Sequence, residues 1–172
     1  PRQVAAAGMS ARRDFDLPAI RAGVLAGEKR AVARAITLVE NRDELAYELV
    51  RDIYPHTGGA MAVGFTGPPG VGKSSLLSSL VTLLRSDQKT VGMVSVDPSS
   101  PFSGGAILGD RIRMQEHTTD PGVYIRSMSS RGHLGGLAAA TPQAVRVLEG
   151  AGCDVVLVET VGVGQAEVEV AS

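Results

Sequence analysis

The sequence predicts an α/β fold in which a mostly parallel sheet is flanked by helices and preceded by a short N-terminal helical segment. Residues 1–57 carry apolar side chains at helical spacing and lack strand-like alternation. After residue 58, short aliphatic runs alternate with helical patterns, as in parallel strands joined by crossover helices. A glycine-rich turn, residues 67–74, joins the first aliphatic run to the first of these helices. We therefore divide the chain into a helical segment, residues 1–57, and an α/β domain, residues 58–172.

Three short helices are expected in the N-terminal segment. Asp16 is suited to cap the first, which has Pro18 in its first turn. The second is expected over residues 28–41, and Asp43 is suited to cap the third over residues 44–54. The segment is either a packing appendage of the following domain or a surface for a partner, and the residues leave both readings open.

The glycine-rich turn fits the phosphate-binding pattern G-x-x-x-x-G-K-[ST] at every fixed position. A strand expected over residues 61–66 and a helix over residues 73–85 give it the required strand, turn and helix context. The glycines let backbone N–H groups surround a polyanion, Lys73 would contact the β and γ phosphates, and the Ser74 hydroxyl would bind Mg²⁺. The expected fold is thus a P-loop NTPase, with nucleotide-binding residues Gly67, Pro68, Pro69, Gly70, Val71, Gly72, Lys73, Ser74 and Ser75.

The helix after the turn is rich in leucine. The spacing predicts one apolar stripe packed on the sheet, formed by Leu76, Leu77, Leu80, Leu83 and Leu84. The side chains expected to face outward are those of Ser78, Ser79 and Arg85.

Two acids are expected at the carboxyl ends of parallel strands, where open α/β sheets bind ligands. Asp97 ends a strand expected over residues 91–96, and Glu159 ends an aliphatic strand over residues 154–159. A third acid, Asp110, follows a long loop and starts a helix expected over residues 111–116. We expect these acids, with Ser74, to hold Mg²⁺ or its water; Asp97 could instead only form a turn before proline, and Asp110 only cap its helix.

Gly162 lies three residues after Glu159, where a backbone amide could contact the γ phosphate and move when it leaves. The expected catalytic residues are Lys73, Glu159 and Gly162. Val163 stands where Ras-like proteins carry the glutamine that orients the attacking water, which predicts slow hydrolysis without help. Gln165 is close in sequence to that position.

Between these acids the pattern predicts a third strand over residues 123–126 and a glycine-rich loop over residues 129–136. Arg131 and His133 in this loop are candidate phosphate or partner contacts, although a surface turn explains them nearly as well. The next helix is expected to start at Thr141-Pro142 and to run to Gly150.

The composition is that of an ordinary globular protein, with 44% hydrophobic and 20% charged residues. A formal net charge of −1 and no long Lys/Arg run argue against nucleic acid or an anionic membrane as the main partner. The single cysteine, Cys153, is expected to be a buried small hydrophobe, which fits a reducing compartment. Because no apolar run approaches the roughly 20 residues that span a bilayer, we expect a cytoplasmic protein.

Five blocks in order resemble one family, the methylmalonyl-CoA mutase accessory GTPases of the MeaB/ArgK group. The blocks are Gly67–Ser74, Val96–Ser100, Ile107–Arg111, Ser130–Gly136 and Val158–Gln165. The resemblance implies GTP/GDP and Mg²⁺ as cofactors and a GTP-hydrolysing chaperone that gates cofactor loading and protects an adenosylcobalamin-dependent methylmalonyl-CoA mutase, which accelerates hydrolysis. The family's P-loop lysine and serine correspond to Lys73 and Ser74, and its metal-linked acids to Asp97, Asp110 and Glu159.

Members of this family continue with further strands, an Asn-Lys-x-Asp motif that reads guanine and a C-terminal dimerisation segment. This chain stops soon after Glu159, so we expect a fragment, and guanine preference and a homodimer follow from the resemblance alone. One alternative is an ATPase or kinase linked to lysine, arginine and ornithine transport, an older label of the group. The other is a metal-insertion GTPase, which should cluster Cys and His, whereas His56, His117, His133 and Cys153 are scattered.

Overall fold

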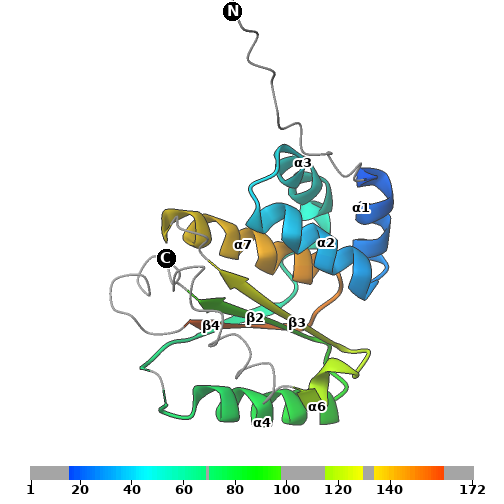
Figure 1. The fold of residues 1–172 in the computed structure, drawn as a ribbon. Coiled ribbons are helices and arrows are strands. Elements are labelled where there is room, and N and C mark those ends of the chain that lie inside the picture. The colour runs from blue at the N-terminus through cyan, green and yellow to red at the C-terminus, as the bar shows by residue number, and fades with distance from the viewer. Residues whose placement is uncertain (1–15, 69, 98–114, 130–133, 161–172) are drawn as a thin grey trace, which may run out of the picture.

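The computed structural model describes residues 16–68, 70–97, 115–129 and 134–160. The sheet lies between two layers of helices (Figure 1). One layer holds α4 (Lys73–Ser86) and the short α6 (Gln115–Thr118). The opposite layer holds α7 (Leu134–Gly150), over which the N-terminal helices pack. Among the described residues, no helix is long and apolar enough to cross a membrane.

The N-terminal segment forms the three expected helices, and the first and third have the caps that the sequence predicts. They are α1 (Leu17–Leu25), α2 (Lys29–Glu40) and α3 (Glu44–Ile53), followed by the 3₁₀ turn η1 (Tyr54–His56). Asp16 Oδ1 accepts a hydrogen bond from the Ala19 amide at 3.1 Å. Asp43 Oδ1 accepts one from the Leu45 amide at 3.0 Å. Each carboxylate satisfies an amide that the first turn of its helix leaves without a backbone acceptor.

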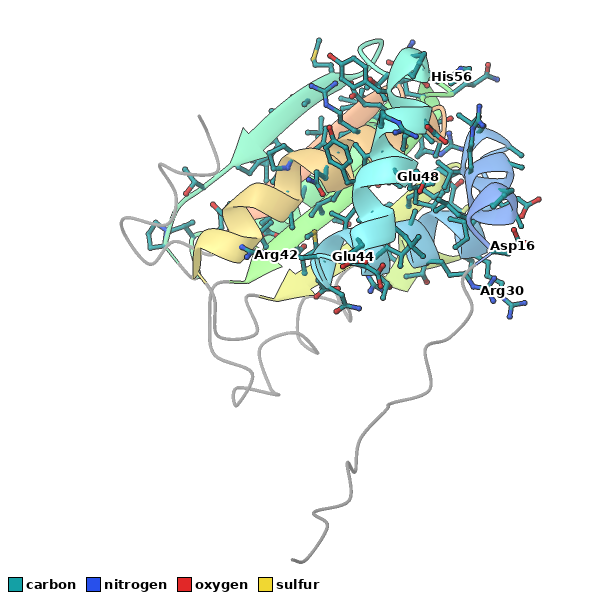
Figure 2. The ribbon with its side chains drawn as sticks, turned by 90° about the horizontal axis from the view of Figure 1, so that it is seen from above. Asp16, Arg30, Arg42, Glu44, Glu48 and His56 are labelled. Carbon is teal, nitrogen blue, oxygen red and sulfur yellow. The ribbon has the colours of Figure 1, made fainter. Side chains whose placement is uncertain are left out.

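The outer face of these helices is charged. Figure 2 looks down on this face and shows Arg30 on α2 with Glu44 and Glu48 on α3, all three of which are exposed. The inner face is apolar, and Ile36, Leu49 and Ile53 are fully buried in it. This division is what the helical periodicity of the sequence predicts.

All strand pairs in the described sheet are parallel, which confirms the predicted fold class. The strands are β1 (Met61–Phe65), β2 (Val91–Asp97), β3 (Val123–Ser129) and β4 (Val155–Thr160), in the spatial order β1-β4-β2-β3. The central strand β4 places Glu159 opposite Phe65 on one side and Ser95 on the other. This register sets the acid beside the end of β1, where the glycine-rich turn begins.

The apolar face of α4 differs from the predicted leucine stripe. Leu77 and Val81 are buried at 0% and 1% exposure, whereas Leu76 and Leu83 are 59% and 60% exposed. The helix is rotated so that Ser74, Leu77 and Val81 face the sheet. Ser74 contacts Glu159 there, and Leu77 and Val81 lie three and seven residues after Ser74, on the same face of the helix. Leu80 and Leu84 pack at the border of this face.

The start of α7 was also predicted wrongly. The helix begins at Leu134 and continues through Pro142, so residues 134–136 belong to the helix and not to a loop. A proline inside a helix removes one backbone hydrogen bond. Burial offsets that loss, because Ala144, Val147 and Leu148 are fully buried against the N-terminal helices and the sheet.

Two apolar clusters hold the layers together. The larger contains buried residues of α1, α2, α3, α7 and the sheet, and the smaller joins α4 to the sheet. Cys153 lies in the larger cluster at 5% exposure, as predicted, and burial, with a smaller effect of the Asp154 charge, raises its pKa to about 12. Its thiol therefore stays protonated and packs as a small hydrophobe.

Candidate functional site

The glycine-rich turn has the backbone conformation that its sequence predicts. Gly67, Gly70 and Gly72 have φ angles of +147°, +83° and +93°, which side chains with a Cβ rarely adopt. No atom lies within 4 Å of where a Cβ would stand at Gly70 or Gly72. Gly72 caps α4 without a side-chain hydrogen bond to the first-turn amides. The turn therefore leaves open space above a helix N-terminus whose amides and dipole favour a phosphate.

Lys73, the first residue of α4, folds back over this turn. Its ammonium group donates hydrogen bonds to the carbonyls of Gly67 and, at 2.9 Å, Pro68. The positive charge thus lies over the turn, where the ammonium group is hydrogen-bonded to carbonyls of the turn itself. A bound polyphosphate would compete for the same ammonium group with full negative charges.

Ser74 and Glu159 meet beneath the turn. The Ser74 hydroxyl donates to Glu159 Oε1 at 3.1 Å, and the two residues are only 8% and 3% exposed. The Ser95 hydroxyl donates to Glu159 Oε2 at 3.4 Å from the neighbouring strand. A carboxylate this deeply buried is costly unless polar groups surround it, and the hydroxyls of Ser74 and Ser95 supply two such groups.

This donor set fits Mg²⁺. Hydroxyl and carboxylate oxygens are the ligands that Mg²⁺ takes from proteins, and it draws further ligands from water and from the phosphates of its nucleotide. Ser74 would contact the ion directly. Glu159, which accepts a hydrogen bond from Ser74, would hold the ion or one of its waters. Among the described residues no three His, Cys, Asp or Glu side chains come together as a metal cage.

Not every predicted site residue can be placed. Asp97 is the last residue of β2, at the same carboxyl edge of the sheet as Glu159, but its side chain lies outside the described residues. Pro69, Asp110 and Gly162 also lie outside them, as do the motifs around Arg131 and Gln165. Val71 and Ser75 are exposed at the turn and at the start of α4. The structure thus brings together the turn, Lys73, Ser74 and Glu159, while the remaining roles stay predictions.

Two contacts that the sequence did not indicate fasten α6 to α4. His117 Nε2 lies 3.1 Å from the hydroxyl and 3.2 Å from the carbonyl oxygen of Ser78. Arg85 makes a two-pronged ion pair with Asp120, with N–O distances of 2.9 and 3.0 Å. The prediction that Ser78 and Arg85 face outward freely is therefore wrong, since both side chains anchor residues 117–120 to α4.

The ion pair shifts the ionisation of both partners. The Arg85 hydrogen bonds, followed by that from the Gly122 amide, lower the pKa of Asp120, and the Asp120 hydrogen bond raises the pKa of Arg85. The carboxylate is therefore charged throughout the physiological range. The pair could not be found from sequence alone, because 35 residues separate its members.

The chain matches known proteins over most of its length. The family model described as "Methylmalonyl Co-A mutase-associated GTPase MeaB" matches residues 32–172. A Pyrococcus abyssi protein named as a GTPase is 62% identical over 144 residues, which are 84% of this chain and 44% of that protein. "GTPase ArgK" of Escherichia coli is 44% identical over 84% of this chain and 45% of its own length.

Two further relatives extend the comparison. A Caenorhabditis elegans protein named "Methylmalonic aciduria type A homolog, mitochondrial" is 40% identical over 86% of this chain and 41% of its own length. The solved structure of an "LAO/AO transport system kinase" superposes with a TM-score of 0.70 at 33% identity, covering 94% of this chain and 48% of that one. The chain spans about half the length, or slightly less, of the relatives it matches.

The family match covers the turn with Lys73 and Ser74, the strand end that carries Asp97, and the Ser74–Glu159 contact. It also covers α3 and most of α2, whereas α1 lies before the matched region. The chain belongs to the MeaB family of methylmalonyl-CoA mutase-associated GTPases.

Proposed function

We propose that the protein is a Mg²⁺-dependent, GTP-binding and GTP-hydrolysing chaperone of an adenosylcobalamin-dependent methylmalonyl-CoA mutase, for which it gates cofactor loading and which it protects from inactivation. The observation that carries the proposal is the buried Ser74–Glu159 contact directly beneath a positive-φ phosphate turn. The family match supports GTP as the bound nucleotide and methylmalonyl-CoA mutase as the partner protein. The protein acts in the cytoplasm as a homodimer.

The residues of the chain divide the work. The amides of the glycine-rich turn and the Lys73 ammonium hold the phosphates and offset the negative charge that develops on them. Ser74, Asp97, Asp110 and Glu159 would hold Mg²⁺ or its water, and the ion would supply charge neutralisation at the phosphate oxygens. The Gly162 amide contacts the γ phosphate. With Val163 in place of a water-orienting glutamine, hydrolysis is slow until the mutase assists.

Phosphate release tests this proposal in the full-length protein. GTP and ATP are compared, each with and without an adenosylcobalamin-dependent mutase. We expect slow release from GTP alone and faster release when the mutase is added. ATP turnover that does not respond to the mutase would contradict the proposal.

A kinase linked to transport is the second candidate, because the solved relative is titled an "LAO/AO transport system kinase". It predicts transfer of the γ phosphate to an acceptor molecule without any partner protein. Labelled nucleotide distinguishes the two, since the chaperone releases inorganic phosphate only. A metal-insertion GTPase is a further alternative. It would be favoured if GTP turnover rose on addition of Ni²⁺ together with the metal-free form of a nickel enzyme.

A further inference from the structure

Ser95 of β2 lies directly beside Glu159 in the sheet. The two residues are partners in the register of the parallel strands β2 and β4, so their side chains point to the same face. The Ser95 hydroxyl donates to Glu159 Oε2 at 3.4 Å, and the Ser74 hydroxyl of α4 donates to the other oxygen, Oε1, at 3.1 Å. The two oxygens of one carboxylate are therefore held from two different elements.

This pair stands where the apolar core ends and the phosphate turn begins. Met93 and Leu157, two residues before Ser95 and Glu159 on the same strands, are 1% and 0% exposed and pack in the apolar cluster beneath α4. Figure 1 shows α4 covering this face of the sheet. Turning the carboxylate away from the hydroxyls and toward the core would bring its charge against these apolar side chains, which costs free energy.

The orientation of a glutamate carboxylate is otherwise loosely defined, because its last torsion angle is broad and roughly two-fold. A single hydrogen bond to Oε1 leaves the carboxylate plane free to turn about that contact, and a second one to Oε2 restrains it. Ser95 is well placed for this purpose. Its strand β2 lies between β4 and β3 and is paired with both.

We propose that Ser95 is a positioning residue for the Mg²⁺ site. By holding Oε2 of Glu159, it keeps Oε1 turned toward Ser74, the residue that would contact the ion. Hydrogen bonds to a carboxylate that serves a metal site orient it and raise the affinity for the metal. The inference rests on the proposed function, since it requires Glu159 to hold the ion or one of its waters.

Ser95→Ala tests this role in the full-length protein. Calorimetry measures the affinity for a non-hydrolysable GTP analogue over a series of Mg²⁺ concentrations and in EDTA. We expect the Mg²⁺ concentration that gives half of the gain in affinity to rise about tenfold, at the lower end of what such outer contacts contribute, because the Ser95 contact is long. The affinity in EDTA should stay unchanged, because Lys73 and the turn are intact.

Two further variants separate positioning from a general effect on the sheet. Ser95→Thr keeps the hydroxyl in a strand, where β-branched residues are favoured, and should show the wild-type Mg²⁺ dependence. Ser127→Ala is the matched control. Ser127 is the partner of Ser95 on β3, is likewise half-buried, and lies one strand further from Glu159. Its truncation should leave the Mg²⁺ dependence unchanged.

Equal Mg²⁺ dependence in Ser95→Ala and Ser127→Ala would overturn the positioning role, while a Mg²⁺-dependent wild type would leave the proposed function standing. An affinity loss in Ser95→Ala that is equally large in EDTA would also overturn it, since the loss would then not involve the ion. If Mg²⁺ had no effect on binding to the wild type, the Mg²⁺-dependent function itself would be contradicted, and the role of Ser95 with it.

Discussion

Glu159 shows how one residue depends on three strands. β4 places it at the carboxyl edge of the sheet, β1 leads from beside it into the phosphate turn, and β2 brings Ser95 to its second oxygen. Glu159 is 3% exposed as a residue, so its interactions are with protein groups and, in the proposed function, with the metal site. Replacing one carboxylate oxygen of Glu159 by an amide group therefore tests its role in the site.

Glu159→Gln should lower GTP turnover far more than GTP binding. The amide keeps the shape and can still accept from Ser74, but it removes the negative charge from the metal site. Turnover in the presence of the mutase and affinity from calorimetry are measured together. Glu48→Gln, on the exposed face of α3, is the control, and wild-type turnover in Glu159→Gln would contradict the metal-site role.

Lys73→Ala should weaken GTP binding by about tenfold or more. The variant loses the only Lys or Arg side chain within residues 67–75, which is the one placed to pair with the phosphates. Calorimetric titration with GTP measures the loss. Lys89→Ala is the control because Lys89 is an exposed lysine 3.8 Å from Asp154, and an unchanged affinity in Lys73→Ala would refute the assignment of the site.

At the scale of the element, α4 serves the site and the core at once. Its first turn carries Lys73 and Ser74, its buried face packs on the sheet, and its far end holds Arg85 against Asp120. The contact of Ser74 with Glu159 and the burial of Leu77 and Val81 lie on one face of the helix and agree with this rotation. The positions of α4 that are buried therefore follow the helical repeat from Ser74, and some of its leucines are left exposed.

Leu77→Ala and Leu76→Ala test this rotation. Leu77 is fully buried, so its truncation should cost about 2–5 kcal/mol of unfolding free energy. Leu76 is mostly exposed, and its truncation should change the unfolding free energy by no more than about 0.5 kcal/mol. Urea denaturation of both variants measures the difference, and equal losses would mean that the leucine stripe was the correct prediction.

Asp120→Asn should destabilise the protein by about 1 kcal/mol near neutral pH, because it removes the charge that Arg85 pairs with. The folded pKa of Asp120 lies below its ordinary value. The stabilisation is therefore complete above the ordinary unfolded pKa and is lost as the pH falls through the folded pKa.

Urea denaturation at several pH values should show the gap between wild type and Asp120→Asn closing in acid. Asp52→Asn is the control, since the Arg51–Asp52 pair joins adjacent residues and Arg51 is 61% exposed. A gap that stays constant down to low pH would show that the loss in Asp120→Asn does not come from the charge.

The elements were largely predictable because their signals are local. The caps at Asp16 and Asp43, the aliphatic runs of the strands and the fixed positions of the turn all lie within a few residues of what they determine. Pro142 was wrongly predicted to mark the start of α7. The helix continues through it because the burial of α7 outweighs one lost backbone hydrogen bond. Ser95, His117 and Asp120 could not be assigned, since each contact joins residues distant in sequence.

At the scale of the whole molecule, the N-terminal helices and the sheet share one apolar cluster. Leu49 and Ile53 of α3 are buried in the same cluster as Val94 of β2 and Leu148 of α7. Arg146 of α7 also lies 4.5 Å from the ring centre of Tyr54. The helices thus contribute to the stability of the layer that supports the site.

We therefore expect α3 and β4 to unfold together. Native-state hydrogen exchange should give buried amides of the two elements similar opening free energies, and Leu49→Ala should lower both by about 2–5 kcal/mol. Tyr47→Ala is the control, because Tyr47 is 74% exposed on the same helix. If α3 opens at much lower free energy than β4, the segment up to residue 57 is an independent appendage.

The buried thiol of Cys153 has a practical consequence. It is the only cysteine in these 172 residues, and with a pKa of about 12 it presents almost no thiolate to an alkylating reagent at neutral pH. A cysteine introduced on the exposed side of α3 or α4 would then react selectively with a maleimide dye, and the native residue could stay in place. Under the proposed function, fluorescence energy transfer from such a dye to a labelled mutase would follow the assembly and disassembly of the complex in real time.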